Sequence, residues 1–299
     1  MSDLRFGMLG LSEGNGHPYS WSAIFNGYDA KKMSECGFPV IPEYLSRQSF
    51  PADCLPDARV THIWTQDSEL SRHVAEACLI ETVVDNYEEM IGQVDAILLA
   101  RDDASRHFEM SAPFIEAGLP IYIDKPLALT VAEAERIYAL QRFDNQIFTC
   151  SALAFARELT LSGAELRSLG QIQRVRAQIP NSWEKYAVHI IEPVLNLIGD
   201  QGEIDRVTGL SEGQHHSVSV IWQTGLETCF RTTGDDPVNI RIDLEGDKAS
   251  KSLQFVDTFA AFKAALGHFV LVVRREKESI PRDLTLKVVR IIEEGASVG

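Results

Sequence analysis

The feature that most restricts the fold of this chain is a set of short runs that are apolar throughout. The clearest are Ala96–Ala100 and Ile121–Ile123, and helical patterns follow them at His107–Ala117 and Val131–Gln141. A strand that is apolar on both faces is typical of a parallel sheet covered by helices on both sides, whereas a half-exposed strand alternates apolar and polar residues. The pattern therefore predicts an α/β domain with a doubly wound parallel sheet.

Other segments of the first half fit the same alternation, and we assign residues 1–152 to this domain. Strands are predicted at Leu4–Leu9, Val60–Thr65, Val83–Val84 and Gln146–Ala152, and helices at Ser20–Phe25, Ser68–Ala77 and Tyr87–Met90. The segment Tyr28–Pro56 is rich in Pro, Gly and Ser and interrupts the alternation. We interpret it as an excursion with a ligand-facing role.

Residues 153–299 show a different pattern, which predicts an α+β domain. Alternating strands are predicted at Gln171–Pro180, Asp205–Glu212, Ser217–Gln223, Glu227–Thr232, Val238–Leu244 and Ser252–Val256, with helices at Tyr186–Ile198, Thr258–Lys277 and Asp283–Glu294. Such strands form an open, antiparallel or mixed sheet with one face that needs a cover. We expect Trp222 and Phe230 to contribute to that face, the C-terminal helix to pack back on the first domain, and the protein to form a homodimer or homotetramer.

Composition restricts the location and the partners of the protein. The formal net charge of −15 argues against nucleic acid and anionic membranes, because phosphate binding requires clustered Lys and Arg. No apolar run approaches the roughly 20 residues that cross a bilayer, and the N-terminus lacks a secretory-signal pattern. The five cysteines are scattered without a CxxC pair, which favours a reduced, cytoplasmic protein. His215 and His216 have no third ligand at metal spacing, so no metal site is predicted.

A lysine, Lys125, stands between the apolar run Ile121–Ile123 and Pro126. Ligands of open α/β sheets bind at the carboxyl ends of the strands, and a proline keeps the residue before it out of the helical region. We therefore expect the Lys125 ammonium group to be aimed at the ligand edge of the sheet. A strand that ends in a solvated lysine is the alternative.

A glycine loop follows the first strand. Gly10 stands where a dinucleotide fingerprint needs a tight turn, Ser12 stands at its second glycine position, and Gly14 lies in a longer loop before the helix. The carboxylate that would bind a ribose should follow the second strand, where Asp67 is the candidate. The start of a helix is the alternative role of Asp67, so NAD and NADP both stay open as cofactors.

Longer segments resemble the glucose–fructose oxidoreductase / inositol dehydrogenase (Gfo/Idh/MocA) family. The strongest match is Val94–Ala100, then His107, then Ala117–Ala128, in which Asp124-Lys125-Pro126 stands for the family's Glu-Lys-Pro. Ser151–Glu158 resembles the family's crossing into the second domain. The resemblance implies an N-terminal Rossmann domain, a C-terminal α+β domain with an open sheet, and an NAD(P)-dependent dehydrogenase or reductase.

The resemblance also implies roles for single residues. Lys125 would hydrogen-bond the reacting hydroxyl and orient the nicotinamide, and His189 would be the acid/base. The family has an aspartate four residues before this histidine, but Lys185 stands there, and a neighbouring cation favours the neutral base form of a histidine. Tyr186 or Glu184 could contribute instead. The residues assigned to the cofactor are Gly10, Ser12, Gly14, Asp67, Ala100, Asp124, Lys125 and Pro126, and those assigned to the substrate are His17, Trp183, Lys185 and Tyr186.

Two functions are compatible with these residues. The favoured one is an NAD(P)-dependent oxidoreductase that transfers a hydride to or from a sugar, an activated sugar or a polyol-like substrate. The alternative is a catalytically silent member of the family that binds a sugar or nucleotide as a regulatory protein, as Lys185 and Ser12 would favour. The sugar, the reaction direction and the choice of cofactor stay open.

Overall fold

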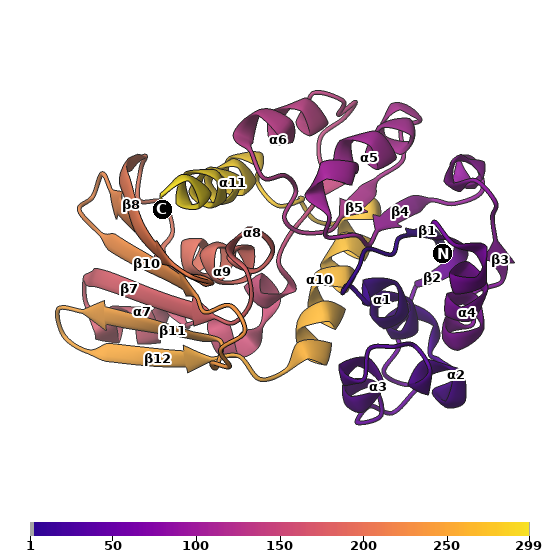
Figure 1. Ribbon diagram of the computed structural model, residues 1–299, viewed down its shortest axis with the longest axis horizontal. Helices are drawn as coiled ribbons and strands as arrows, with labels where there is room; N and C mark the ends of the chain where they lie inside the picture. The colour runs from indigo at the N-terminus through magenta and orange to yellow at the C-terminus, as the bar shows by residue number, and fades with distance from the viewer. Residues whose placement is uncertain (1–2, 299) are drawn as a thin grey trace. The chain divides into compact units, whose positions relative to one another are not determined.

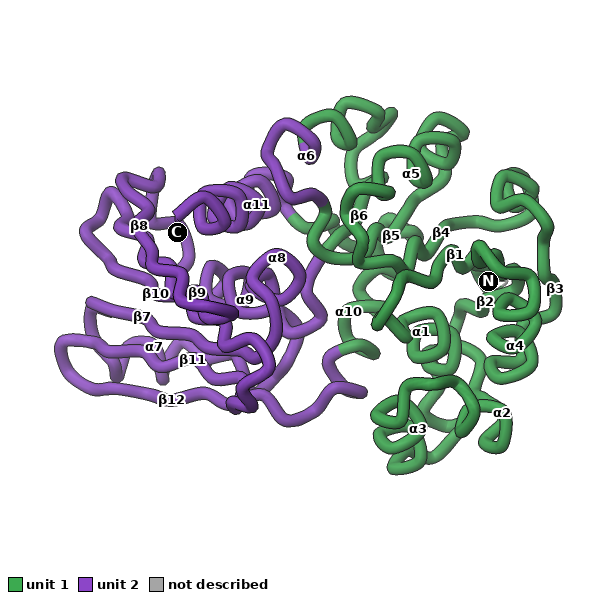
Figure 2. The backbone as a smooth tube through the Cα atoms, viewed as in Figure 1, with its two compact units in different colours: residues 1–127, 135–149, 262–280 green, residues 128–134, 150–261, 281–299 purple. Residues whose placement is uncertain are grey.

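The computed structural model describes residues 3–298, and the chain divides into two compact units (Figure 2). Unit 1 contains Met1–Leu127, Glu135–Thr149 and Phe262–Ile280. Unit 2 contains Ala128–Ala134, Cys150–Ala261 and Pro281–Gly299. Each unit is therefore assembled from segments that are far apart in the sequence.

Unit 1 is built on a six-stranded parallel sheet with the order β3-β2-β1-β4-β5-β6, and the predicted doubly wound fold is confirmed (Figure 1). Its strands are β1 (Leu4–Leu9), β2 (Ala58–Trp64), β3 (Thr82–Val83), β4 (Ala96–Leu99), β5 (Ile121–Ile123) and β6 (Ile147–Phe148). The strand order reverses beside β1, and ligands of such sheets bind at this switch point, outside the carboxyl ends of the strands.

Helices lie on both faces of this sheet (Figure 1). Unit 1 holds α1 (His17–Asn26), α2 (Ala30–Ser34), α3 (Val40–Leu45), α4 (Ser68–Cys78) and α5 (His107–Glu116), with the 3₁₀ turns η1 (Tyr87–Met90) and η2 (Ala104–Arg106). Two helices, α6 (Val131–Tyr138) and α10 (Thr258–Val273), belong in part to each unit. Phe269 of α10 is fully buried and its ring lies 5.7 Å from that of Phe6 and 5.6 Å from that of Tyr122. The core of unit 1 therefore includes residues from late in the chain.

The excursion at residues 28–56 is an ordered part of unit 1, because it contains α2 and α3. Its side chains Phe38 and Ile41 pack against Gly16, where a Cβ would lie 2.5 Å from Ile41 Cδ1 and 2.8 Å from Phe38 Cγ. The excursion thus covers the start of α1, and its ligand-facing role stays a prediction.

Unit 2 is built on a mixed six-stranded sheet with the order β12-β11-β7-β10-β9-β8, in which only β10 and β7 run parallel among the described strands. Its elements are η3 (Ala152–Phe155), η4 (Arg157–Leu159), α7 (Gly163–Leu169), β7 (Ile172–Ile179), α8 (Trp183–Tyr186), α9 (Val188–Ile198), β8 (Ile204–Glu212), β9 (His215–Trp222), β10 (Glu227–Thr232), β11 (Arg241–Gly246), β12 (Ser250–Gln254) and α11 (Arg282–Ser297). The helix predicted at residues 186–198 corresponds to α9, and the short helix α8 before it and α7 were not predicted.

The outer face of this sheet differs from the prediction. Trp222 and Phe230 are 2% and 0% exposed, so they belong to the inner core of unit 2 and their expected place on the open face is wrong. The alternation of β9 and β10 puts them inward, and the Trp222 indole donates to the buried Thr228 hydroxyl at 3.1 Å. The other face carries ion pairs instead, such as Arg174 with Glu227 at 2.9 Å. A homodimer or homotetramer stays a prediction.

None of the helices among the described residues combines the length and the apolarity that a membrane span requires. Those residues also hold no group of three or more His, Cys, Asp and Glu side chains placed to bind a metal ion.

Candidate functional site

Lys125 lies at the carboxyl edge of the unit 1 sheet, directly after β5. Its side chain is 6% exposed, and its Nζ lies 4.0 Å from Oδ2 of Asp102, which follows β4. The Asp124 N–H donates to the Leu99 carbonyl and so keeps this segment in register with β4. The ammonium group is therefore buried at the carboxyl edge of the sheet and does not extend into bulk water.

Ser12 connects the glycine loop to the same carboxylate. Its hydroxyl donates to Asp102 Oδ1 at 2.7 Å and accepts the Asp102 N–H at 3.1 Å, and both residues are buried. A Cβ on Gly10 would lie 2.6 Å from the Ala100 carbonyl oxygen, so only glycine fits where the loop crosses the end of β4. Gly14 has a φ of +78° and open space around it, as the tip of a loop does. The serine at the second glycine position is thus part of the Lys125–Asp102 arrangement.

Asp124 is the centre of a second buried cluster in unit 1. Its Oδ2 accepts from Asn15 Nδ2 at 2.8 Å and lies 2.6 Å from His17 Nδ1, while its Oδ1 accepts the Lys125 N–H at 2.8 Å. Burial raises the pKa of this carboxyl, but His17, Lys125 and Asn15 outweigh that effect and the net pKa is below the ordinary value. The His17 ring also stacks on Trp21 with centroids 4.9 Å apart. His17, assigned to substrate from the sequence, is therefore a partner of Asp124.

Arg101 and His107 make hydrogen bonds at the same edge of the sheet that were not predicted from the sequence. Arg101 donates to the Leu11 carbonyl and to Gln66 Oε1, each at 3.1 Å, and pairs with Asp103 at 2.6 Å. The fully buried His107 ring bridges the carbonyl oxygens of Leu127 at 2.9 Å and Arg101 at 2.8 Å. The segment after Lys125 is thereby tied to the end of β4.

Asp67 has the helix-starting role that was its alternative. Its Oδ1 accepts the N–H groups of Glu69 at 2.8 Å and Leu70 at 3.3 Å, so it is the N-cap of α4. A contact between Asp67 and a ribose stays a prediction.

Unit 2 holds His189, at the start of α9. The His189 Nδ1 lies 2.7 Å from the hydroxyl of Ser151, and the Ser151 N–H donates to Glu192 Oε2 at 2.6 Å. Burial raises the pKa of Glu192 to about 8, although the Ser151 N–H opposes the shift. The Tyr186 ring lies 5.7 Å from that of His189, and Lys185 and Tyr186 are half-buried on α8. Neither Ser151 nor Glu192 was a sequence candidate, because neither has a spacing that marks a site.

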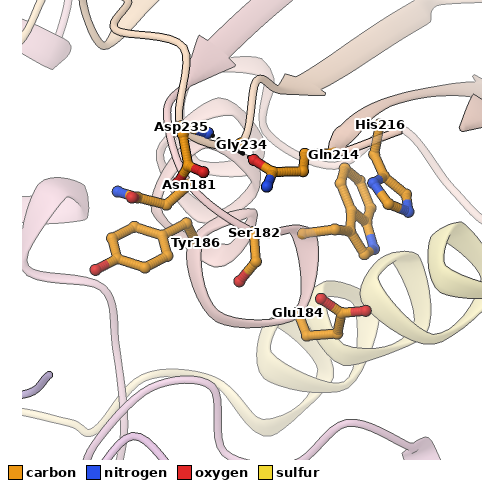
Figure 3. A pocket seen from close by; sticks show the side chains of 9 residues that line it. Asn181, Ser182, Glu184, Tyr186, Gln214, His216, Gly234 and Asp235 are labelled. Atoms are coloured by element: carbon orange, nitrogen blue, oxygen red, sulfur yellow. Dashed lines mark hydrogen bonds between the residues drawn. The ribbon is translucent and has the colours of Figure 1, made fainter. Parts of the chain in front are cut away.

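A pocket with a volume of about 430 Å³ lies beside α8 within unit 2 (Figure 3). Trp183 is fully buried, with its Nε1 donating to the Ile292 carbonyl at 2.9 Å, and it forms an apolar wall. Most other side chains of the lining are polar (Figure 3), and the His216 ring lies 6.3 Å from that of Trp183. The lining consists of Asn181, Ser182, Trp183, Glu184, Tyr186, Gln214, His216, Gly234 and Asp235. A cavity of this size and polarity suits a small polar molecule.

Comparisons with known proteins agree with this fold. Residues 44–151 match the sequence profile of an oxidoreductase family with an NAD-binding Rossmann fold, and the resemblance to the Gfo/Idh/MocA family is confirmed. No curated protein matches the sequence. The myo-inositol 2-dehydrogenase of Lactobacillus plantarum is 14% identical with a TM-score of 0.73, and the match covers 99% of this chain and 97% of that one.

Two further solved structures are similar to this chain. GenD2 from gentamicin A biosynthesis, solved with NAD, is 13% identical with a TM-score of 0.77, over 99% of this chain and 94% of that one. Biliverdin reductase from Synechocystis sp. PCC 6803, solved with biliverdin and NADP⁺, is 11% identical with a TM-score of 0.70, over 98% of each chain. At these identities the structural likeness shows the fold.

Proposed function

We propose that this chain is an NAD(P)-dependent oxidoreductase acting on a sugar, an activated sugar or a polyol, in keeping with the match of residues 44–151 to an oxidoreductase family with an NAD-binding Rossmann fold. The observation that carries the proposal is the Lys125 ammonium group, buried at the carboxyl edge of the sheet and 4.0 Å from Asp102. Burying a lysine is costly unless it is paired, so its position indicates a function at this edge.

The residues around the glycine loop fit a dinucleotide. Gly10 allows the loop to cross β4 closely, and Gly14 leaves its tip open for a pyrophosphate to approach the backbone. The N–H of His17 is already bonded to Asn15 Oδ1 at 2.9 Å, and Pro18 has no N–H, so the first turn of α1 offers few donors. We infer that the Ser12–Gly14 backbone holds the pyrophosphate.

The proposed site residues then each have a task in the reaction. A bound nicotinamide supplies the hydride acceptor or donor. The Lys125 ammonium donates a hydrogen bond to the oxygen of the reacting carbon, and Asp102, 4.0 Å away, orients the ammonium. His189 takes the hydroxyl proton when the alcohol is oxidised and returns it when the carbonyl is reduced.

Cofactor binding is tested first, by thermal unfolding with NADH and with NADPH. A ligand at 100 times its dissociation constant stabilises the folded state by about 2.7 kcal/mol, so the true cofactor raises the midpoint clearly. Turnover is then measured with inositols, free sugars and nucleotide sugars, from the absorbance of the reduced nicotinamide.

Lys125→Met should bind the cofactor but lose at least about 100-fold in kcat, because the donor to the reacting oxygen is gone. Lys32→Met is the matched control, since Lys32 pairs with Glu76 on the surface of the same unit. Unaltered turnover in Lys125→Met rejects the proposed role.

A second candidate, binding without turnover, is favoured by Lys185, which stands where the family has an aspartate. Two results favour this reading: no shift with any nicotinamide cofactor, or cofactor binding without turnover of any substrate in the screen.

A further inference from the structure

Three buried or half-buried residues of unit 2 are connected by hydrogen bonds, through both the backbone and the side chain of Ser151. Glu192 Oε2 accepts the Ser151 N–H at 2.6 Å, and the Ser151 hydroxyl lies 2.7 Å from His189 Nδ1. Ser151 is 0% exposed and Glu192 is 4% exposed. The contacts join residues about forty positions apart, since Ser151 follows β6 whereas His189 and Glu192 lie on α9.

The Ser151 hydroxyl is oriented by its own backbone as well. It caps the 3₁₀ turn η3 by accepting the Leu153 N–H at 3.2 Å. A hydroxyl has one hydrogen and two acceptor sites, so it can still either donate to His189 Nδ1 or accept a hydrogen from it. Its position is therefore fixed while its hydrogen-bonding direction is free to reverse.

Resting on the function proposed above, we propose that Ser151 is the positioning residue of His189, and that Glu192 holds Ser151 in place by accepting the Ser151 backbone N–H. A carboxylate can only accept a hydrogen from Nδ1. The serine hydroxyl accepts it when Nδ1 is protonated and donates to Nδ1 when it is not. In the tautomer that takes a proton at Nε2, Nδ1 carries its hydrogen before and after the transfer, so the serine hydroxyl accepts that hydrogen throughout the step and keeps the ring in one orientation.

The state of Glu192 supports this assignment. Burial raises the pKa of Glu192 to about 8, so at neutral pH the carboxyl group is mostly uncharged. Its Oε1 has no hydrogen-bond partner among the described residues. Glu192 therefore contributes an anchor for the Ser151 backbone and no full negative charge beside the imidazole ring.

The direct test is the ¹⁵N resonance of His189 Nδ1, measured without cofactor or substrate. Ser151→Ala removes the hydroxyl, and Ser151→Cys keeps its volume but leaves a much weaker hydrogen-bonding group. Ser162→Ala is the matched control, because Ser162 also caps a helix of unit 2, by accepting the Glu165 N–H at 3.3 Å. We expect the Nδ1 resonance to move in both Ser151 variants and to stay in place in Ser162→Ala.

Kinetics give the second readout. Ser151→Ala should lower kcat about tenfold with little change in KM, because the ring is present but loosely oriented. Ser151→Thr, which keeps a hydroxyl, should restore most of kcat, and Ser162→Ala should not reproduce the loss.

The proposal is overturned by an Nδ1 resonance that is the same in the wild type, Ser151→Ala and Ser151→Cys, or by an equal fall in kcat in Ser162→Ala. If Ser151→Ala does not fold, the Nδ1 resonance of Ser151→Cys is compared with that of the wild type instead. Should the wild type turn over no substrate, the proposed function fails, whereas the resonance still decides whether Ser151 positions the ring.

Discussion

Asp124 and Glu192 are both buried carboxyl groups, and their surroundings move their pKa values in opposite directions. Burial raises both, but Asp124 lies against His17, Lys125 and Asn15, so its net pKa is lowered. Glu192 has only the Ser151 N–H to oppose burial, and its pKa rises to about 8. One carboxyl therefore carries charge in the folded protein at neutral pH, and the other mostly does not.

Glu192→Gln should stabilise the protein at neutral pH, by an amount that depends on pH. The unfolded chain releases this proton near pH 4.5, whereas the folded protein keeps it to about pH 8. Stability is therefore lost as the pH rises between these values, by roughly 1.4 kcal/mol per unit. Glutamine does not titrate, so urea unfolding should show a gain of about 3 kcal/mol at pH 7 and under about 1 kcal/mol at pH 5.

The control for that experiment is Glu165→Gln. Hydrogen bonds from the Ser162 N–H and hydroxyl, and then Lys251, lower the pKa of Glu165 to about 2. This carboxylate stabilises the folded state above the unfolded pKa, so its replacement should destabilise the protein at pH 7. A gain in Glu165→Gln equal to that in Glu192→Gln would contradict the assignment of the effect to burial.

Asp124→Asn should destabilise the protein by about 3 kcal/mol or more at neutral pH, because it removes the anion from a buried charged cluster. The loss should shrink as the pH falls through the lowered pKa of Asp124, where the wild-type carboxylate is protonated too. Chemical unfolding at several pH values measures both effects. Asp95→Asn, which breaks the exposed pair with Arg5, should cost under about 1 kcal/mol, and an equal cost in the two variants would count against the buried cluster.

The sequence marks Lys125 as a candidate for chemistry but gives no sign of the residues that contact one another around the candidate sites. Lys125 is marked by an apolar strand before it and a proline after it. Ser151 and Glu192 carry no such mark, because they meet only through the fold, across 41 positions of the chain. Asn15 reaches Asp124 across 109 positions. Local spacing has no information on pairs of this kind.

Helices α10 and α11 each contain one interior glycine, and the two glycines have different reasons to be there. A Cβ on Gly267 would lie 3.4 Å from Leu55 Cδ2, which is ordinary contact, whereas a Cβ on Gly295 would collide with the Trp183 indole ring. That ring is held by its hydrogen bond to the Ile292 carbonyl at 2.9 Å. Gly295 is thus required by packing between α11 and α8, and Gly267 is not.

Alanine at these two positions should therefore have opposite effects. Gly267→Ala should stabilise the protein by about 0.5–1 kcal/mol, the gain in helix propensity over glycine. Gly295→Ala has the same gain but should destabilise on balance, since overpacking a core costs about 1–3 kcal/mol. Thermal and urea unfolding of both variants measure the difference, and a stabilised Gly295→Ala would show that the Trp183 ring can move.

Elements with strong patterns were predicted almost residue by residue, as β1 (Leu4–Leu9) shows. The helix α7 was missed because its pattern spans only Gly163–Leu169, two turns held by the Ser162 capping box. The strand predicted at Gln146–Ala152 is longer than β6, which ends at Phe148, because the Ser151 side chain caps the turn η3 that follows. Hydrophobic periodicity does not register such side-chain caps.

Over the whole molecule, the chain enters each unit more than once. The sequence places the boundary at residue 152, close to the passage from Thr149 to Cys150, but Phe262–Ile280 returns to unit 1. The last helix, α11, belongs to unit 2. Composition and periodicity reveal the change of pattern along the chain, whereas the return of α10 depends on which apolar surface is left uncovered by the first segment.

The fragment of residues 1–149 should consequently not fold by itself, although it contains every strand of its sheet. It lacks α10, whose Phe269 packs on Phe6, Tyr122 and Phe148, and the Ser279 hydroxyl, which donates to the Ile147 carbonyl at 2.7 Å. Losing one buried phenylalanine costs about 3–5 kcal/mol, a large share of the stability of an ordinary domain. A second fragment, with residues 258–280 joined to residue 149 by a long flexible linker, restores these contacts. Circular dichroism on heating should show a cooperative transition for the linked fragment only, and the same transition in residues 1–149 alone would mean that α10 is not needed for the core of unit 1.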